Sequence, residues 1–308
     1  MANQRPSRIE PPATVAFIGL GKMGVPMAGR LATAGFRVRG ADPSDAARTR
    51  FAKTGGSAFA DAREAVAGAA AVVTMLPDGK VVREALLGAG GFAAALARGA
   101  LVIDMSSSAP TDTTSLGAEL ASRGIVLIDA PVSGGVGGAA SATLAIMAGG
   151  PGDQVERARP ILAALGKSIF LTGKLGSGHA MKALNNYVSA AGLLAASEAL
   201  LVGRRFGLEP ATIIEILNAS SGRNVATELK LKQFIVSGSY ASGFALALMA
   251  KDVGIAAALA EHLALDTPLV GATARLWDEA RAALATEADH TEIYRFIADR
   301  DGGSKSSG

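Results

Sequence analysis

The first half of the chain contains five short apolar runs separated by stretches with helical spacing. The runs cover residues 14–18, 38–42, 71–76, 101–105 and 126–129. Their apolar residues are consecutive and do not alternate with polar ones, which is typical of strands buried on both faces of a sheet. Strands of this kind that alternate with helices predict a doubly wound parallel sheet with helices on each face.

The pattern changes at a glycine-rich segment, residues 173–178. Two more strands are predicted before it, at 143–147 and 168–171, and no strand pattern recurs after it. The remaining chain predicts helices at 179–206, 210–218, 226–236, 245–262 and 268–285. The long helix from residue 179 is apolar almost all round, which is typical of a buried helix, and its core is expected to include Leu184, Leu193, Leu194 and Leu200.

These elements predict an α/β Rossmann-type doubly wound sheet domain over residues 13–175 and an all-α C-terminal domain over 176–298, joined by a long interdomain helix. Residues 1–12 and 299–308 are expected to be disordered. We interpret the first domain as the dinucleotide-binding part and the second as the substrate and dimerisation part.

Composition narrows the class of protein. The 308 residues are 49% hydrophobic and 19% charged, with a net charge of +3 from scattered basic residues, so a globular protein without a nucleic-acid footprint is expected. There are no cysteines, which excludes disulfides, thiolate catalysis and cysteine-based zinc sites, and no metal site is predicted. Residues 1–12 lack the apolar core of a signal peptide, and Glu198 interrupts the apolar stretch 189–203, so a cytoplasmic protein is expected.

A glycine-rich loop directly follows the first strand and opens a helix predicted over residues 20–34. Its residues are Gly19, Leu20, Gly21, Lys22, Met23 and Gly24. The first glycine permits the tight turn, the second allows the backbone to approach a pyrophosphate, and the third allows close packing of helix on strand. A plain strand–turn–helix is the alternative, but the flanking elements favour dinucleotide binding.

Asp42 ends the next strand, about 20 residues further on. A carboxylate there can accept hydrogen bonds from the ribose hydroxyls of NAD and would repel the 2′-phosphate of NADP, so NAD is the predicted cofactor. The alternative is an aspartate that merely begins a turn before Pro43. Arg39 and Arg48 are near enough in sequence to leave some use of NADP open.

Two more strands end in loops that should face the cofactor, because ligands of open α/β sheets bind beyond the carboxyl ends of the strands. One loop contains Leu76 and Pro77, and the other contains Ser107. Ordinary strand-to-helix turns remain the alternative for both.

Lys182 lies on a polar stripe of the long helix. Lys182, Asn185, Asn186 and Ser189 fall at i, i+3, i+4 and i+7, so they share one face. Buried polar side chains need partners, and a cleft that holds a polar ligand would supply them. The positive helix N-terminus and partial burial should lower the pKa of Lys182 toward the range useful for a general acid/base. An exposed helix face with a routine lysine is the alternative, and His179, His262 and His290 are weaker candidates.

A second glycine-rich segment, residues 129–138, follows the strand that ends at Asp129. Consecutive backbone N–H groups in such a turn form a nest for an anion such as a carboxylate, and Ser133 adds a hydroxyl. A flexible loop with nothing bound is the alternative.

Together these motifs resemble the 3-hydroxyisobutyrate dehydrogenase family of β-hydroxyacid dehydrogenases, within the 6-phosphogluconate dehydrogenase-like superfamily. The resemblance runs from about residue 14 to residue 297. It is carried by the first glycine-rich loop with Met27 and Ala28, by residues 129–135, by residues 176–178 followed by Lys182, Asn185 and Asn186, and by the pair Lys251 and Asp252.

The resemblance implies a role for individual residues. It implies that Lys182 is catalytic and that Asn186 holds the substrate beside it. The substrate contacts that it implies are Ser133, Gly134, Gly135, Phe244 and Asp252. The cofactor contacts that it implies are Leu76, Pro77, Ser107 and Lys251, in addition to the first glycine-rich loop. It further implies a homodimer or homotetramer formed through the helical domain.

Three departures from the family pattern stand out. Ser107 replaces a usual threonine, Val81 replaces a cofactor-contacting asparagine, and Ser141-Ala142 replaces a usual glycine. The sequence therefore predicts NAD-dependent oxidation of a small 3-hydroxy acid, with hydride passing to NAD and Lys182 exchanging the proton in the cleft between the domains. The hydroxy acid itself stays open, and 3-hydroxyisobutyrate, L-serine, 3-hydroxypropionate, 4-hydroxybutyrate and threonate-like acids all fit.

Three alternatives remain at this point. One is a reductase of short semialdehyde acids of the tartronate or succinic semialdehyde type. Another is an imine reductase, although those enzymes usually carry Asp or Tyr in place of Lys182. The third, from a different class, is a catalytically silent dinucleotide-binding module, which would not need the polar stripe.

Overall fold

The computed structural model describes residues 7–303, with side chains as far as residue 300. The chain divides into two compact units, Met1–Lys182 and Ala183–Gly308. The division falls inside helix α8 (Ser177–Phe206), later in the chain than the predicted domain boundary. Each unit is described by itself.

The first unit is built on a nine-stranded sheet with the strand order β3-β2-β1-β4-β5-β6-β8-β7, and β9 pairs with β8. Its strands are β1 (Thr14–Ile18), β2 (Arg37–Ala41), β3 (Ser57–Phe59), β4 (Ala71–Thr74), β5 (Leu101–Asp104), β6 (Val126–Asp129), β7 (Val132–Ser133), β8 (Leu144–Gly149) and β9 (Gly166–Gly173). The pairs from β3 to β6 are parallel, whereas β8 runs antiparallel to β6 and β7. The predicted parallel sheet is confirmed, and β3 and β7 are additions to the prediction.

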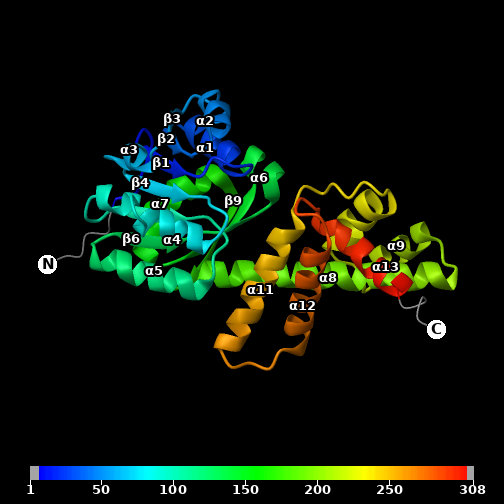
Figure 1. Cartoon of the computed structure of the whole chain (residues 1–308). Helices are drawn as coiled ribbons and strands as arrows, with labels where there is room; N and C mark the ends of the chain where they lie inside the picture. The colour runs from blue at the N-terminus through cyan, green and yellow to red at the C-terminus, as the bar shows by residue number, and fades with distance from the viewer. Residues whose placement is uncertain (1–6, 304–308) are drawn as a thin grey trace. The chain divides into compact units, whose positions relative to one another are not determined.

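Helices cover both faces of this sheet (Figure 1). They are α1 (Gly24–Thr33), α2 (Asp45–Ala52), α3 (Ala62–Val66), α4 (Gly79–Leu87), α5 (Pro110–Ser122), α6 (Gly135–Ser141), α7 (Gly152–Leu165) and a 3₁₀ turn at Phe92–Ala95. Alternate residues of one strand enter opposite cores: Val15 and Phe17 pack with α1, α2 and α7, whereas Ala16 and Ile18 pack with α3, α4 and α5. Burial on both faces explains the uninterrupted apolar runs of the sequence.

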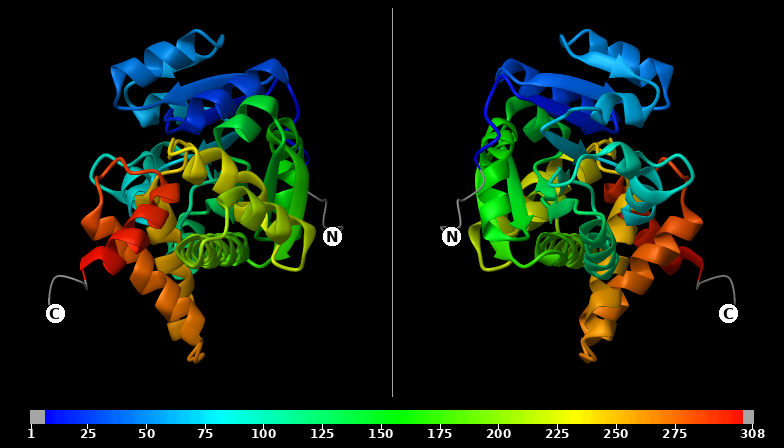
Figure 2. Two further views of the ribbon diagram at one scale, coloured as in Figure 1. Left: turned by 90° about the vertical axis from the view of Figure 1, so that its right-hand side faces the viewer. Right: turned by 90° about the vertical axis from the view of Figure 1, so that its left-hand side faces the viewer.

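The second unit is helical. After the shared helix α8 it contains α9 (Pro210–Ala219), α10 (Val225–Leu229), a π-helical turn η2 (Leu231–Val236), α11 (Leu246–His262), α12 (Pro268–Ala283), a 3₁₀ turn η3 (His290–Glu292) and α13 (Ile293–Gly303). Helices α11 and α12 run side by side as an antiparallel hairpin (Figure 1, Figure 2). The core of this unit surrounds the fully buried Trp277.

Several predicted boundaries were wrong. Helix α1 begins at Gly24 and not at residue 20, because Gly19 adopts a positive φ of 99° and residues 21–23 form a turn. The predicted helix 226–236 changes at Lys230 from α10 to η2. Leu184 was predicted in the core but is 41% exposed, because α8 buries only one side, which carries Leu193, Leu194 and Leu200.

The chain ends also differ from the prediction. Arg8 and Ile9 are held against α7: Ile9 is buried, its N–H donates to the Arg157 carbonyl oxygen, and Arg8 pairs with Glu156. Helix α13 continues to Gly303 through part of the predicted tail. The remaining residues expected to be disordered, 1–6 and 304–308, lie outside the described part of the chain.

Candidate active site

The first glycine-rich loop connects β1 to α1, and its three glycines meet different surroundings. A Cβ atom at Gly19 would collide with the Met75 carbonyl oxygen, and one at Gly24 would collide with the Gly19 carbonyl oxygen. A Cβ atom at Gly21 would meet nothing within 4 Å. Two glycines are thus needed by the protein's own packing, while the space beside Gly21 is open to a ligand.

The N-terminus of α1 is suited to a phosphate group. No side chain caps the helix at Met23, and its first turn contains no acidic residue. Backbone N–H groups at an uncapped helix start are available to an anion, which the helix dipole also favours. The open space beside Gly21 and these donors fit the pyrophosphate of a dinucleotide.

Asp42 directly follows β2, next to this loop. Its Oδ2 accepts a hydrogen bond from the Leu20 N–H at 2.8 Å, and its Oδ1 accepts one from the Ser44 N–H at 2.8 Å. Arg48 donates to the carbonyl oxygens of Asp42 and Pro43 and pairs with Asp45. The carboxylate is therefore positioned beside the glycine-rich loop, and the nearby guanidinium is engaged by the backbone.

The loops after β4 and β5 are tied together by buried hydrogen bonds. Asp104 accepts hydrogen bonds from the Thr74 hydroxyl at 2.8 Å and from the Ser106 N–H at 3.1 Å. Ser106 in turn accepts one from the Leu76 N–H at 2.9 Å. Ser106 is buried while its neighbour Ser107 is partly exposed, so the network fixes both loops and leaves Ser107 accessible.

The second glycine-rich segment is more regular than the predicted turn. Ser133 ends the short strand β7, Gly134 has a φ of +130°, and Gly135 begins helix α6. Gly134 and Gly135 are exposed and Ser133 is partly exposed. The prediction of an extended glycine-rich turn was wrong beyond Gly135, but these three residues remain accessible to a ligand.

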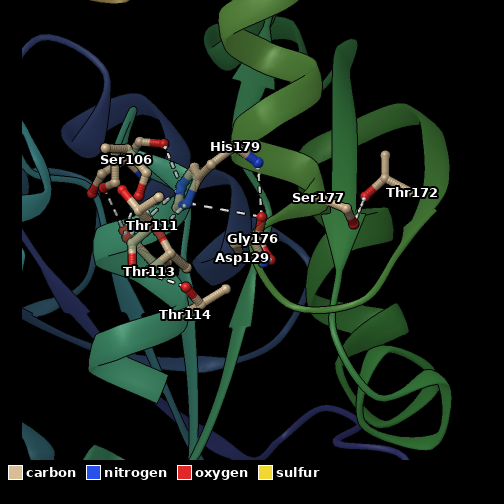
Figure 3. Close-up of polar contacts among 12 residues, drawn as sticks. Ser106, Thr111, Thr113, Thr114, Asp129, Thr172, Gly176, Ser177 and His179 are labelled. Carbon is tan, nitrogen blue, oxygen red and sulfur yellow. Dashed lines mark hydrogen bonds and ion pairs between the residues drawn. The ribbon is translucent and has the colours of Figure 1, made fainter. Parts of the chain in front are cut away.

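Asp129 anchors the start of α8 to the end of β6 (Figure 3). Its side chain is fully buried and accepts hydrogen bonds from the N–H groups of Gly176 and His179, each at 2.8 Å. Lys182, one turn further along the helix, is partly buried. The first turns of α8 therefore lie at the carboxyl edge of the sheet, where the loops after β4 and β5 begin.

Asn186 follows Lys182 by one turn of α8 and is buried in the helical unit. Its Nδ2 donates to Asp252 Oδ2 at 2.6 Å, and its Oδ1 accepts from Asn185 Nδ2 at 3.1 Å. Lys251 pairs with the other oxygen of Asp252 at 3.1 Å. Three predicted site residues, Asn186, Lys251 and Asp252, are thus in contact with one another or with Asn185.

Phe244 is held by His290. The backbone N–H of His290 donates to the Phe244 carbonyl oxygen at 2.8 Å, and the imidazole and phenyl rings meet edge to face. Lys230 Nζ lies 2.6 Å from His290 Nε2. Burial lowers the pKa of Lys230 below its ordinary value, although the charge of Asp289 opposes this effect.

Asp289 organises the same corner of the helical unit. It accepts hydrogen bonds from the Ser242 hydroxyl, the Gly243 N–H, and the N–H and hydroxyl of Thr291. Burial alone would raise the pKa of Asp289, but the hydrogen bonds from His290, Thr291 and Ser242 hold it well below its ordinary value. The segment that carries Phe244 is therefore rigidly connected to the start of η3.

His179 is the residue that sequence reasoning undervalued. It stands at a helix start, where a polar residue needs no special explanation, yet its side chain is fully buried within the first unit. Its partners are 50 to 73 residues distant in sequence, so no local pattern could have identified them. Among the described residues no group of three His, Asp or Glu side chains is arranged to hold a metal ion.

Comparison with known proteins assigns the family. Residues 14–173 match the NAD-binding domain of 6-phosphogluconate dehydrogenase, and residues 176–297 match the family described as NAD-binding of NADP-dependent 3-hydroxyisobutyrate dehydrogenase. A 3-hydroxyisobutyrate dehydrogenase of Pseudomonas aeruginosa is 40% identical over 267 residues, which cover 85% of this chain and 89% of that protein. The chain belongs to the 3-hydroxyisobutyrate dehydrogenase family.

A second relative and a solved structure are similar to this chain over nearly its whole length. A 2-(hydroxymethyl)glutarate dehydrogenase of Eubacterium barkeri is 34% identical, covering 96% of this chain and 98% of that protein. The solved structure of a Mycobacterium tuberculosis 3-hydroxyisobutyrate dehydrogenase with L-serine matches with a TM-score of 0.86 at 35% identity, covering 92% of this chain and 99% of that one. The dehydrogenase is an oxidoreductase of hydroxy acids that uses a nicotinamide dinucleotide, and the predicted family and fold class are confirmed.

Proposed function

We propose that the dehydrogenase oxidises a small 3-hydroxy acid to the corresponding aldehyde or keto acid, with NAD as the hydride acceptor and Lys182 as the general acid/base. The observation that carries the proposal is the link from Asp129 to the first turn of α8. This link supports the proposal that Lys182 lies at the carboxyl edge of the sheet, where the glycine-rich loop and the loops after β4 and β5 begin. Ligands of such sheets bind at this edge.

The proposed cofactor contacts are the residues of the first glycine-rich loop, with Asp42 at the ribose and Leu76, Pro77, Ser107 and Lys251 along the remainder. The fit of the loop to a pyrophosphate supports this assignment. When bound by these residues, NAD would supply the hydride acceptor of the reaction in its nicotinamide ring. The engagement of Arg48 by backbone carbonyls favours NAD over NADP, because it leaves that guanidinium less available to a 2′-phosphate.

The proton step falls to Lys182. Its neutral amine takes the proton of the substrate hydroxyl as the hydride leaves the carbon that bears this hydroxyl. The alcohol therefore loses two electrons and two hydrogens in all. In the reverse direction the ammonium group polarises the carbonyl and returns the proton. Lys182 is partly buried in the second turn of α8.

Asn186 is proposed to hold the substrate oxygen beside Lys182. One of its N–H bonds is used by Asp252 and its oxygen by Asn185, so a single N–H is left for a ligand. Asp252 therefore orients the amide, and with Phe244 it is proposed to line the substrate site. Ser133, Gly134 and Gly135 are proposed to bind the substrate carboxylate, and their exposure supports this role.

The names of the relatives narrow the substrate class. 3-Hydroxyisobutyrate, 2-(hydroxymethyl)glutarate and L-serine share a primary alcohol on the carbon next to the one that carries the carboxylate. We propose that this chain also acts on acids with the unit HO–CH₂–CH(R)–COO⁻. A panel of 3-hydroxy acids, with lactate as a 2-hydroxy control and with NAD and NADP compared, tests this class; oxidation of lactate alone would contradict it.

The Lys182→Ala variant tests the mechanism. We expect kcat to fall by about 10³-fold or more, since positioned general acid/base groups contribute roughly 10² to 10⁴. The affinity for NADH should change little, as measured by calorimetric titration. Lys174→Ala, which removes an exposed lysine before α8, is the matched control and should keep its turnover. Near-normal turnover of the Lys182→Ala protein would reject the assignment.

We also propose a cytoplasmic homo-oligomer that binds neither nucleic acid nor membrane. By length and composition α8 could cross a bilayer, but core helices of globular proteins meet the same criterion. Leu193, Leu194 and Leu200 of α8 pack in the core of the helical unit, which supports a core role.

A further inference from the structure

The imidazole of His179 occupies the centre of a buried network within the first unit. Nδ1 lies 2.8 Å from the Thr113 hydroxyl of α5, and Nε2 lies 3.1 Å from the Ser106 carbonyl oxygen in the loop after β5 (Figure 3). The backbone N–H of His179 donates to Asp129 at the end of β6. One residue thus joins helix α8 to α5 and to the ends of two strands.

The contacts define where the ring carries a proton. The Ser106 carbonyl oxygen can only accept, so Nε2 must be the protonated nitrogen that donates to it. The Thr113 hydroxyl can donate to Nδ1 or to the Ala109 carbonyl oxygen, which lies 3.0 Å from it. The charged groups that face the ring are Asp104, 3.8 Å from Nε2, and Asp129, 3.8 Å from Nδ1.

Ser106 extends this contact to both cofactor loops. Its hydroxyl accepts from the Leu76 N–H, its own N–H donates to Asp104, and its neighbour is Ser107. A continuous set of hydrogen bonds therefore runs from the loop after β4, through Ser106, to the imidazole on α8. Lys182 stands three residues after His179, and side chains at this spacing lie on the same side of a helix.

We infer that His179 is a positioning residue that fixes the rotation of α8, and with it the direction of Lys182, relative to the two cofactor loops. The inference rests on the proposed role of Lys182 as the acid/base. The imidazole itself exchanges no proton with the substrate. Its Nε2–H bond to Ser106 is the contact that matters for turnover, while its Nδ1 contact with Thr113 serves stability alone.

Two substitutions separate the nitrogens of the ring. His179→Gln places an amide N–H near the position of Nε2 and can keep the bond to Ser106, whereas His179→Asn reaches only the position of Nδ1. Thr113→Val is the matched control, because it removes the other hydrogen bond of the same ring with little change in side-chain shape.

We expect His179→Asn to lower kcat by about 10- to 100-fold, because small misplacement of a reacting group can cost about 10² in rate. His179→Gln and Thr113→Val should stay within about threefold of the native kcat, and the KM for NAD should change less than kcat in all three variants. Melting temperatures of Thr113→Val and His179→Asn should fall by similar amounts, so that stability alone cannot account for the difference in turnover.

Nitrogen-15 NMR of the native enzyme tests the contact without any substitution. The chain has only three histidines, and the His179→Gln spectrum identifies the resonance. A protonated Nε2 that exchanges slowly with solvent supports the inference. An Nε2 without a proton would overturn it, as would a kcat of His179→Asn near the native value or a loss in Thr113→Val as large as in His179→Asn.

A double-variant cycle distinguishes this inference from the proposed function. If His179 acts through Lys182, then His179→Asn should cost little further turnover in a Lys182→Ala background, because coupled residues are not additive. A large loss in Lys182→Ala with a fully additive effect of His179→Asn would overturn the role of His179 alone. Normal turnover of Lys182→Ala would instead reject the proposed function.

Discussion

Asp42 holds the turn after β2, and we propose that it also determines the choice of cofactor. Each of its carboxylate oxygens already accepts one backbone N–H, from Leu20 or Ser44, and a carboxylate oxygen can accept a second donor. The remaining capacity suits ribose hydroxyls, while the negative charge disfavours a 2′-phosphate.

Replacing Asp42 by Ser should therefore change the cofactor preference. We expect kcat/KM with NAD to fall about 10- to 100-fold, the equivalent of losing one hydrogen bond to a charged group, and the ratio of NADP to NAD activity to rise. Steady-state rates with both cofactors measure the ratio. Asp61→Ser, which removes the carboxylate that caps α3 after the neighbouring strand, is the control and should leave the ratio unchanged. An unchanged ratio in Asp42→Ser would argue against ribose recognition by Asp42.

At the scale of elements, the end of helix α6 contains a strained residue. Ala142 has a φ of 56° and a ψ of 37°, the left-handed conformation. A residue with a Cβ atom pays roughly 1–2 kcal/mol for this conformation. The turn predicted to differ from the family pattern is thus formed by alanine in a conformation that glycine adopts freely.

Ala142→Gly should raise the free energy of unfolding by about 0.5–1 kcal/mol, since the relief of strain exceeds the added flexibility of the unfolded chain. Urea denaturation measures the change. Ala140→Gly, two residues earlier on the exposed side of the same helix, is the control and should lower the stability by about 0.5–1 kcal/mol. A loss of stability in both variants would show that no strain is stored at Ala142.

The elements that the sequence predicts well are those whose local pattern agrees with their environment. β6 was predicted residue for residue, because its apolar run is buried on both faces. β3 and β7 have three and two residues and too little pattern to recognise, and the change from α10 to η2 has no marker in the sequence. The same holds for the candidate site. The glycines and Lys182 can be recognised from the residues around them in the sequence, whereas the contacts of His179 with Thr113 and Ser106 are visible only in the folded chain.

At the scale of the whole molecule, helix α8 presents a long apolar face to solvent. Leu184, Val188, Val202 and Phe206 are exposed and stand at i, i+4, i+18 and i+22, and since 18 residues make five turns, they lie along one side. The row of apolar residues is about 33 Å long, and the exposed Glu198 lies beside it between Val188 and Val202. Phe206 at its end is 83% exposed. An apolar face of this size supports the proposed homo-oligomer, because monomers rarely expose one.

Val188→Glu combined with Val202→Glu should convert the proposed oligomer to monomers, because paired carboxylates would be buried at its interface. Light scattering gives the mass. Lys232→Glu, a charge change at an exposed polar position of the same unit, is the control and should leave the mass unchanged. A native protein that is already monomeric would refute the assembly.

The three glycines of the first loop should differ in how freely they can change during evolution. Substitution at positions 19 or 24 would damage the polypeptide itself, so selection for mere foldedness preserves them. The fold itself does not require glycine at position 21, because a methyl group there would meet no atom within 4 Å. On the proposed role of Gly21 at the pyrophosphate, a relative that no longer binds the coenzyme can replace this residue and still fold.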